Sequence, residues 1–198
     1  MGRWSGRLAP RLVQFAAVVD GDDVLDVGTG TGSLAAFVAA AAPSSRVVGI
    51  DRSEAHVAVA RGRHPSPRLR FEVGDAQRLP FEAASFDRTL SLLIRNFVPQ
   101  PQTALAEMIR VTRPGGTIAA AVWDYGEGME MLRRFWDEAT ALDSRADGVE
   151  VTPAPVGRPS RWTDFAARTG VGCPRSCAIA RQPLAIALAL PETAQSAA

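Results

Sequence analysis

Short apolar runs alternate with helix-like segments along the first two thirds of the chain. Runs such as Asp23–Val27 are typical of parallel strands buried on both faces, which carry nearly continuous apolar sequence. The pattern predicts five strands, at 23–27, 46–50, 69–73, 86–93 and 117–123. Apolar positions at helical spacing predict helices at 8–19, 33–42, 53–61 and 101–111. Together they predict an α/β fold, a doubly wound and mostly parallel sheet with helices on both faces.

The pattern weakens after Asp124. It predicts one helix at 129–142, which either caps a pocket or packs on the sheet, then a loop at 143–160 and a shorter helix at 161–169. Residues 171–198 contain three prolines, which cannot donate to a strand ladder, and only 184–190 resembles a strand. We therefore expect an incomplete or irregular C-terminal strand pair, and an exposed sheet edge through which two copies form a homodimer.

Composition narrows the function classes. The 198 residues predict a single domain: a helical segment at 1–20, a core at 21–123, a cap region at 124–170 and an irregular tail at 171–198. A net charge of +1 gives no bulk attraction to nucleic acid or membrane. We find neither a secretory signal nor a membrane-spanning apolar run, and we expect a cytoplasmic protein.

Two residue types exclude particular chemistries. All 22 basic residues are Arg, so Schiff bases, a Walker lysine and a Tyr–Lys dehydrogenase pair are excluded. The two cysteines, Cys173 and Cys177, have no nearby His and cannot build a four-ligand zinc site. We expect no metal.

A strand runs directly into a glycine loop at 24–32, with the sequence Val-Leu-Asp-Val-Gly-Thr-Gly-Thr-Gly. Glycine is needed where the backbone bends through positive φ or approaches a ligand closely. The loop follows the first strand, at the usual ligand crevice of an open α/β sheet. By itself the loop is a weak signal, and the alternative is a tight strand-to-helix turn without a ligand.

Two acidic residues follow the next two strands. Asp51 lies 19 residues after Gly32, where an acid can accept hydrogen bonds from both ribose hydroxyls of an adenosine. It can also cap the helix that opens at Ser53. Asp75, within Gly-Asp-Ala after the third strand, can accept from an adenine amino group, or it belongs to a surface turn. A dinucleotide fingerprint would place glycine at Ser33, so the loop disfavours a nicotinamide cofactor.

Four ordered motifs resemble the class I S-adenosylmethionine-dependent methyltransferases. They lie at 24–34, 48–51, 74–81 with 85–87, and 111–117, where Arg-Pro-Gly-Gly forms a turn before the fifth strand. The match is most similar to the type 11 branch, which includes the ubiquinone/menaquinone-biosynthesis-like enzymes, and covers roughly residues 1–142. The resemblance implies S-adenosylmethionine as cofactor and in-line methyl transfer to a small-molecule acceptor, which it does not identify.

The resemblance also implies which residues hold the cofactor. Asp26 and the backbone of Gly28, Thr29 and Gly30 are expected around its methionine part, and Gly32 completes this loop. Asp51 and Arg52 are expected at the ribose and the adenine. Asp75, Ala76 and Gln77 are expected at the adenine edge, and Leu92 near the sulfonium. The segment 2–5 is expected to fold over the cofactor, with Arg3 near its carboxylate.

No catalytic base is assigned. His56 and His64 are predicted at the surface, whereas four residues after the fourth and fifth strands are predicted to line the substrate side: Asn96, Trp123, Asp124 and Tyr125. Two other functions stay open. One is a catalytically inactive protein that binds S-adenosylmethionine or S-adenosylhomocysteine. The other is an NAD(P)-dependent oxidoreductase, which Ser33 and the absence of Lys disfavour.

Overall fold

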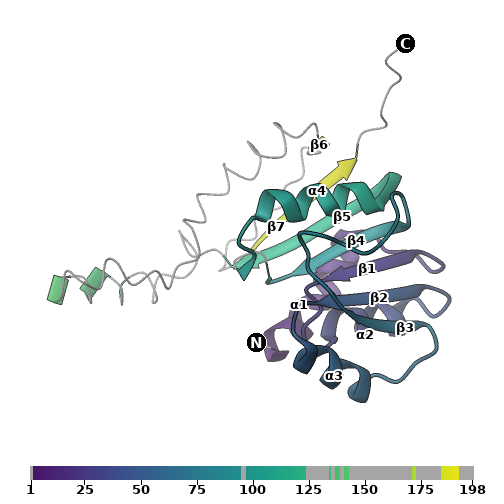
Figure 1. Cartoon of the computed structure of the whole chain (residues 1–198), viewed down its shortest axis with the longest axis horizontal. Coiled ribbons are helices and arrows are strands. Elements are labelled where there is room, and N and C mark those ends of the chain that lie inside the picture. The colour runs from purple at the N-terminus through teal and green to yellow at the C-terminus, as the bar shows by residue number, and fades with distance from the viewer. Residues whose placement is uncertain are drawn as a thin grey trace, which may run out of the picture.

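A single twisted sheet organises the part of the chain that the computed structural model describes, namely residues 2–94, 97–123, 134, 137–138, 141–142, 171–172 and 184–191. Its strand order is β3-β2-β1-β4-β5-β7-β6 (Figure 1). The first five strands are parallel, β7 pairs antiparallel with β5, and β6 pairs antiparallel with β7. The strands are β1 (Asp23–Val27), β2 (Arg46–Asp51), β3 (Leu69–Val73), β4 (Phe86–Leu92), β5 (Thr112–Trp123), β6 (Val171–Gly172) and β7 (Leu184–Pro191). The predicted α/β class is confirmed.

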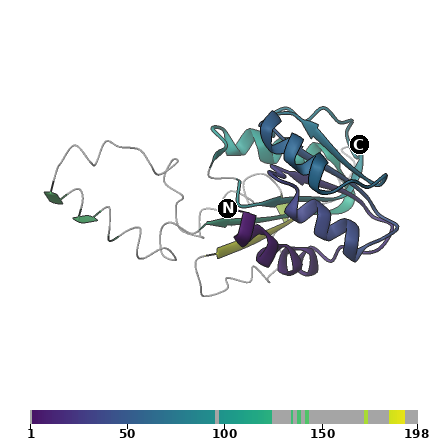
Figure 2. The same cartoon turned by 90° about the horizontal axis from the view of Figure 1, so that it is seen from below.

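Helices cover both faces of the sheet. They are α1 (Gly2–Phe15), α2 (Ser33–Ala41), α3 (Glu54–Arg63) and α4 (Pro101–Val111). α1 and α2 lie on the face opposite α4 (Figure 2). Buried Leu12 and Val38 join the cluster on the first face, to which α3 adds Val57, whereas Met108 of α4 packs in the second cluster with Leu25. The sheet therefore lies between two apolar layers, as a doubly wound fold requires.

The first helix differs from the sequence prediction at both ends. The predicted helix at 8–19 is wrong in its bounds, because α1 spans Gly2–Phe15 and Val19 lies beyond it, 56% exposed. Ala17 adopts a left-handed φ of 49°, and the Val18 and Ala17 amides donate to the carbonyls of Val13 and Gln14. This is a Schellman termination, which stops the helix before the apolar pattern stops.

The predicted turn at Arg-Pro-Gly-Gly lies inside a strand. β5 begins at Thr112, which pairs with Phe86, and the ladder resumes where Thr117 pairs with Arg88. The extra residues of β5 form a bulge with a φ of 80° at Gly115. A Cβ at Gly116 would lie 2.7 Å from the Asp87 carbonyl oxygen, so glycine permits the close approach of β4.

The C-terminal strands are only partly irregular. β7 pairs with β5 over six residues from Ile118↔Ala189 to Trp123↔Leu184, which confirms the strand predicted at 184–190. Pro191 lies at the end of β7, where a missing donor is tolerated. β6 is short, as expected, and pairs at only two positions. The predicted elements at 143–160 and 161–169, and most of the helix at 129–142, lie outside the described residues.

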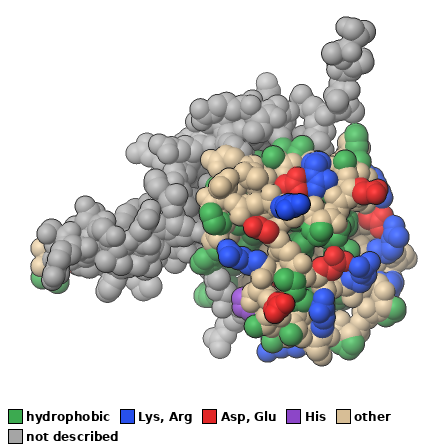
Figure 3. Space-filling model, viewed as in Figure 1, with side chains coloured by type: hydrophobic (Ala, Val, Ile, Leu, Met, Phe, Trp, Pro, Cys, Tyr) green, Lys and Arg blue, Asp and Glu red, His purple; other side chains and the backbone are tan. Residues whose placement is uncertain are grey.

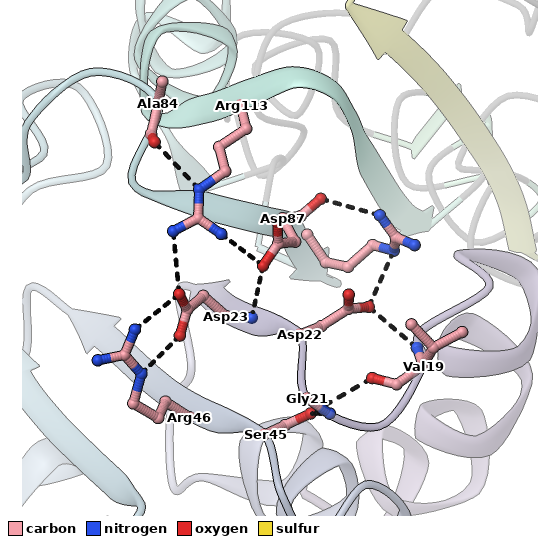
Figure 4. A network of polar contacts seen from close by, with 10 residues as sticks. Val19, Gly21, Asp22, Asp23, Ser45, Arg46, Ala84, Asp87 and Arg113 are labelled. Atoms are coloured by element: carbon pink, nitrogen blue, oxygen red, sulfur yellow. Dashed lines mark hydrogen bonds and ion pairs between the residues drawn. The ribbon is translucent and has the colours of Figure 1, made fainter.

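An ion-pair network joins the amino-terminal ends of the strands (Figure 4). Asp23 of β1 accepts from the guanidinium groups of Arg46 at 2.7 Å and Arg113 at 3.0 Å. Arg113 also donates to Asp87 at 2.7 Å, and Arg88 lies 3.3 Å from Asp22. We call Asp23, Arg46, Asp87 and Arg113 the basal clasp, because it ties β1, β2, β4 and β5 together at the end of the sheet where these strands begin.

Candidate functional site

A cavity of about 480 Å³ lies at the carboxyl ends of the strands, at the opposite end from the basal clasp. Its lining comes from the segments that follow β1, β2, β3 and β4. β1 and β4 are neighbours, yet β1 leads to α2 on one face while β4 leads to α4 on the other. Such a switch point opens a crevice between the two diverging chains, which is where ligands bind in sheets of this kind.

The glycine loop needs glycine for two different reasons. Gly28, Gly30 and Gly32 have φ angles of 75°, 56° and 85°, a region that side chains rarely adopt. A Cβ at Gly28 would lie 2.5 Å from Ile94 Cγ1, and one at Gly32 would lie 2.8 Å from Phe71 Cζ. Nothing lies within 4 Å of a Cβ at Gly30. Gly28 and Gly32 therefore serve packing, whereas Gly30 leaves open space beside the cavity.

The amide groups of the loop point into the protein. Gly28 N and Thr29 N donate to the Ile50 carbonyl at 2.8 and 2.9 Å, and Gly30 N donates to Asp51 Oδ2 at 2.9 Å. A phosphate-binding loop works by offering free amides to the anion. These three donors are already engaged, so this loop presents a different surface to a ligand.

Asp26 lies at the base of the cavity and is only 1% exposed. Its Oδ2 accepts from the Thr29 hydroxyl at 2.7 Å and from Ala35 N at 3.1 Å. Its Oδ1 is buried and has no hydrogen-bond partner among the described residues. Burial raises the pKa of Asp26 to about 7. The two hydrogen bonds oppose this rise, and a smaller repulsion from Asp51 adds to it.

Asp51 ties the glycine loop to the start of α3. Its Oδ2 accepts from Gly30 N, and its Oδ1 accepts from Ser53 N at 2.9 Å. Ser53 is the N-cap of α3, as predicted, and its hydroxyl accepts from His56 N at 3.3 Å. The His56 imidazole Nδ1 lies 3.6 Å from Asp51 Oδ1. Asp51 therefore holds the glycine loop and the start of α3 in a fixed relation, and it lines the cavity together with its neighbour Arg52.

The third acid is positioned by a side chain that stays outside the cavity lining. Asp75 is exposed, and its Oδ1 accepts from Gln77 N at 2.9 Å and from Gln77 Nε2 at 3.2 Å. The Oε1 of Gln77 accepts from Gln100 N, just before α4. Asp75 and Ala76 line the cavity, but Gln77 does not. Gln77 acts here as a brace between the Asp75 turn and α4.

Nine of the eleven predicted site residues line the cavity. The exceptions are Gln77 and Gly32, since Gly32 caps α2 and packs against Phe71. The wall beyond β4 is apolar throughout and extends well past the predicted leucine; it comprises Leu92, Leu93, Ile94, Phe97, Val98 and Pro99. The described part of the cavity thus has three carboxylates on one side and hydrocarbon on the other.

Leu93 makes the bend that builds this apolar wall. It adopts a left-handed φ of 64° although it carries a branched side chain, and it is 2% exposed. Its amide donates to the Ala121 carbonyl at 2.7 Å, which anchors the bend to β5. Beyond it the chain crosses the glycine loop, and Ile94 comes to lie against Gly28. Backbone strain at such a position is typical of functional sites.

Some lining residues were not anticipated. His56 was predicted at the surface and is exposed, yet it also lines the cavity, because α3 starts beside Asp51. His64 is half-buried near Phe71, outside the lining. From α1, Ser5 lines the cavity, in agreement with the expected N-terminal segment; the Arg3 side chain lies outside the described residues. The same holds for Asn96, Asp124, Tyr125 and the Trp123 side chain.

None of the helices in the described ranges is long and apolar enough to span a membrane. The described residues also contain no group of three or more His, Cys, Asp or Glu side chains arranged to hold a metal ion.

Comparison with known proteins agrees with this geometry. Residues 24–116 match the family model of a methyltransferase domain. The chain is 41% identical over 115 residues to the demethylmenaquinone methyltransferase of Renibacterium salmoninarum, covering 58% of this chain and 46% of that one. It is 35% identical over 103 residues to a phthiotriol/phenolphthiotriol dimycocerosates methyltransferase of Mycobacterium leprae, covering 52% of this chain and 38% of that one. The matches thus span less than half the length of these curated relatives.

A solved structure extends the agreement to nearly the whole chain. The SAM-dependent methyltransferase of Aquifex aeolicus superposes with a TM-score of 0.70, at 17% identity, over 93% of this chain and 92% of that one. At 17% sequence identity, this structural similarity is evidence for the fold alone. The family model covers the glycine loop, Asp51, Asp75 and the bulge within β5, so sequence and fold agree on the same region. Residues 24–116 of the chain therefore belong to the methyltransferase-domain family, and the fold around them is that of a SAM-dependent methyltransferase.

Proposed function

We propose that the cavity binds S-adenosylmethionine and that the chain transfers its methyl group to a small-molecule acceptor. Two observations together carry this proposal. Three carboxyl groups line the cavity, and the backbone amides of the glycine loop already donate hydrogen bonds within the protein. Asp26, Asp51 and Asp75 suit a ligand with cationic groups and hydroxyl donors, whereas a pyrophosphate would find the amides of residues 28–30 already bonded. This favours S-adenosylmethionine over a nicotinamide dinucleotide.

The nine predicted residues that line the cavity each have a place in this proposal. Asp26 and the loop at 28–30 would surround the methionine part, Asp51 with Arg52 the ribose and adenine, and Asp75 with Ala76 the adenine edge. Leu92 would lie near the sulfonium, on the apolar wall. A cavity of about 480 Å³ falls within the range of sites that enclose a small molecule.

The chain's own contribution to the reaction is positioning and exclusion of water. When bound, S-adenosylmethionine would supply a methyl group on a positively charged sulfur. An acceptor atom would bond to the methyl carbon in line with the carbon–sulfur bond that breaks, and S-adenosylhomocysteine would be left. The strained bend at Leu93 holds the hydrocarbon wall rigidly against the loop, so an acceptor atom is aligned in a dry environment. Phe97, which is 54% exposed, extends this wall to the cavity mouth. An acceptor with a substantial apolar part fits this surface best.

Calorimetry tests the binding part of this proposal. S-adenosylhomocysteine should bind the native chain with 1:1 stoichiometry, and NADH should not. Asp51→Ala should weaken binding at least tenfold, because it removes the ribose acceptor and the anchor of Gly30 N. Failure of S-adenosylhomocysteine to bind would refute the proposal, and unchanged affinity in the variant would refute the ribose assignment.

Turnover is tested separately with a panel of acceptors. Methyl transfer to any small molecule, followed by mass spectrometry, would support an enzyme. Binding of S-adenosylhomocysteine without transfer across the panel would favour the inactive cofactor-binding alternative. The names of the curated relatives suggest quinone-like and long-chain phenolic or alcoholic acceptors as the first compounds to test.

The proposal also includes location and partners. We infer a cytoplasmic protein without a nucleic-acid partner; basic and acidic side chains are interspersed on the face drawn in Figure 3, with no continuous basic stripe. A homodimer through the β7 edge is the proposed assembly, because β6 pairs with β7 at only two positions. Sedimentation at high concentration should show a dimer, and a strictly monomeric profile would refute it.

A further inference from the structure

The Oδ1 atom of Asp26 is a buried polar atom of the cavity that lacks a hydrogen-bond partner among the described residues. Both hydrogen bonds to this carboxylate reach Oδ2, from Thr29 and Ala35. Oδ1 is buried from solvent and has no partner among the described residues. A buried carboxylate oxygen without a donor is costly, and native structures retain such groups mainly at functional sites.

No cation balances this carboxylate in the described part of the chain. Of the neighbouring elements, β2 contributes Asp51, whose negative charge repels that of Asp26 and so raises the pKa of Asp26. α2 contributes only the Ala35 amide, β4 places Leu90 opposite Asp26 in the ladder, and α1 contributes Ser5 to the cavity. His56 of α3 lies beside Asp51, and exposed Arg52 lines the outer part of the cavity.

We propose that the entry of a ligand with a cationic amino-acid end expels a proton from Asp26, so that ligand binding is coupled to proton release. This inference rests on the proposed function, and the ligand concerned is the aminocarboxylate end of the cofactor. The Asp26 O–H bond breaks, the proton passes to solvent, and the carboxylate remains near the incoming ammonium group. Charge is balanced, because one positive charge enters the site as one leaves.

The physical basis is the opposite effect of burial and of a nearby cation. Burial holds the pKa of Asp26 at about 7 in the empty cavity. An ammonium group within roughly 4 to 6 Å typically lowers the pKa of a carboxyl group by about 1 to 3 units. Near pH 7 the empty site is therefore about half protonated, and the occupied site is almost fully ionised. Affinity then rises with pH up to about 7 and levels off above it.

Calorimetry in paired buffers measures this coupling directly. S-adenosylhomocysteine is titrated in phosphate and in imidazole at pH 6.0 and 7.0, and in bicine and in Tris at pH 8.5. The two buffers of each pair differ in ionisation enthalpy, so the difference in binding enthalpy between them gives the protons released. For a pKa shift of about 1 to 3 units we expect about 0.4–0.9, 0.4–0.5 and close to zero protons respectively. From pH 7 to pH 6 the affinity should fall by about three- to fivefold. Adenosine, which lacks the ammonium group, should bind without releasing a proton.

Two variants assign the proton to its residue. Asp26→Asn should bind S-adenosylhomocysteine with no buffer dependence at any of the three pH values. His56→Gln, which alters the nearest titratable group on α3, should release the same number of protons as the native chain. If Asp26→Asn does not fold, the comparison of S-adenosylhomocysteine with adenosine on the native chain still decides.

The outcomes separate this inference from the proposed function. Binding without buffer dependence would overturn proton coupling and leave the cofactor assignment intact. Proton release that persists with adenosine, or that disappears in His56→Gln, would overturn the role of Asp26. Absence of binding to the native chain would instead contradict the proposed function.

Discussion

At the scale of single residues, the glycine loop separates two requirements that look identical in sequence. Gly28 and Gly30 both have positive φ, but only Gly28 lies against another side chain, that of Ile94. A Cβ at Gly30 meets nothing within 4 Å and would project into the region where the loop borders the cavity. One glycine is thus needed for packing and the other for access.

Alanine substitution should distinguish these two roles. Gly28→Ala should lower the free energy of unfolding by about 2–4 kcal/mol, because backbone strain adds to overpacking against Ile94. Gly30→Ala should cost only about 1 kcal/mol, from strain alone, yet weaken S-adenosylhomocysteine binding at least tenfold. Urea denaturation and calorimetry measure the pair. Equal losses of stability in the two variants would contradict this assignment.

Asp26 should also make the stability of the empty protein depend on pH. Its folded pKa, about 7, lies above the unfolded value of 3.8, so the folded state holds more protons between these two values. Stability should therefore fall as pH rises from about 4 to 7.

In Asp26→Asn this component disappears. The change in unfolding free energy between pH 5 and pH 8 should differ from that of the native chain by about 2–3 kcal/mol. Asp75→Asn, which makes the same substitution at an exposed acid of the same cavity, serves as the control. A native slope in Asp26→Asn would show that Asp26 is not the residue responsible.

At the scale of elements, the two ends of the strands serve different purposes. The carboxyl ends carry the cavity, where the buried Oδ1 of Asp26 has no hydrogen-bond partner among the described residues. The amino ends carry the basal clasp, where acids and guanidinium groups are matched. Hydrogen bonds from Arg46 first, and also from Arg113, hold the pKa of Asp23 below its ordinary value against the effect of burial. Burial alone would raise the pKa of Asp87, but the Asp23 amide and Arg113 lower it overall.

Removing the arginine of β5 tests the basal clasp. Arg113→Met should destabilise the chain by about 1–2 kcal/mol at pH 7, because Asp23 and Asp87 each lose a charged donor. Both folded pKa values lie below 3.8, so this stabilisation is complete above pH 3.8 and disappears as the pH falls through the folded values.

An exposed ion pair provides the comparison for the clasp. Arg70 is 74% exposed and pairs only with Glu72 in the described contacts, so Arg70→Met should change stability by less than about 0.5 kcal/mol. Denaturant titrations at several pH values measure both variants. An Arg113→Met effect that is no larger than this, or that persists below the folded pKa values, would contradict the clasp.

At the scale of the whole molecule, ligand binding should stabilise the fold cooperatively. The cavity collects segments that follow four different strands, so a ligand bridges β1, β2, β3 and β4. At a concentration of 100 times its Kd, S-adenosylhomocysteine should add about 2.7 kcal/mol and raise Tm by roughly 5–10 °C. Differential scanning calorimetry measures the shift, and NADH at the same concentration should give none.

Much of this architecture was predictable because it depends on local chemistry. Continuous apolar runs identified four of the parallel strands to within a residue, and Ser53 was predicted as a helix cap from its residue type. The glycine loop, Asp51 and Asp75 were identified because each follows a strand directly, and parallel strands align their carboxyl ends at one edge. Sequence order therefore translates into proximity for these residues.

The α/β alternation and the set of acids that line the cavity could be derived from the sequence. The role of each acid depends on the folded arrangement. Asp26 is a buried carboxyl group whose Oδ1 has no hydrogen-bond partner among the described residues, and Gln77 is a brace because Gln100 lies opposite it. The bend at Leu93, the bulge at Gly115 and the end of α1 at Ala17 depend on backbone conformation. Contacts between distant segments set such properties, and apolar periodicity records burial alone.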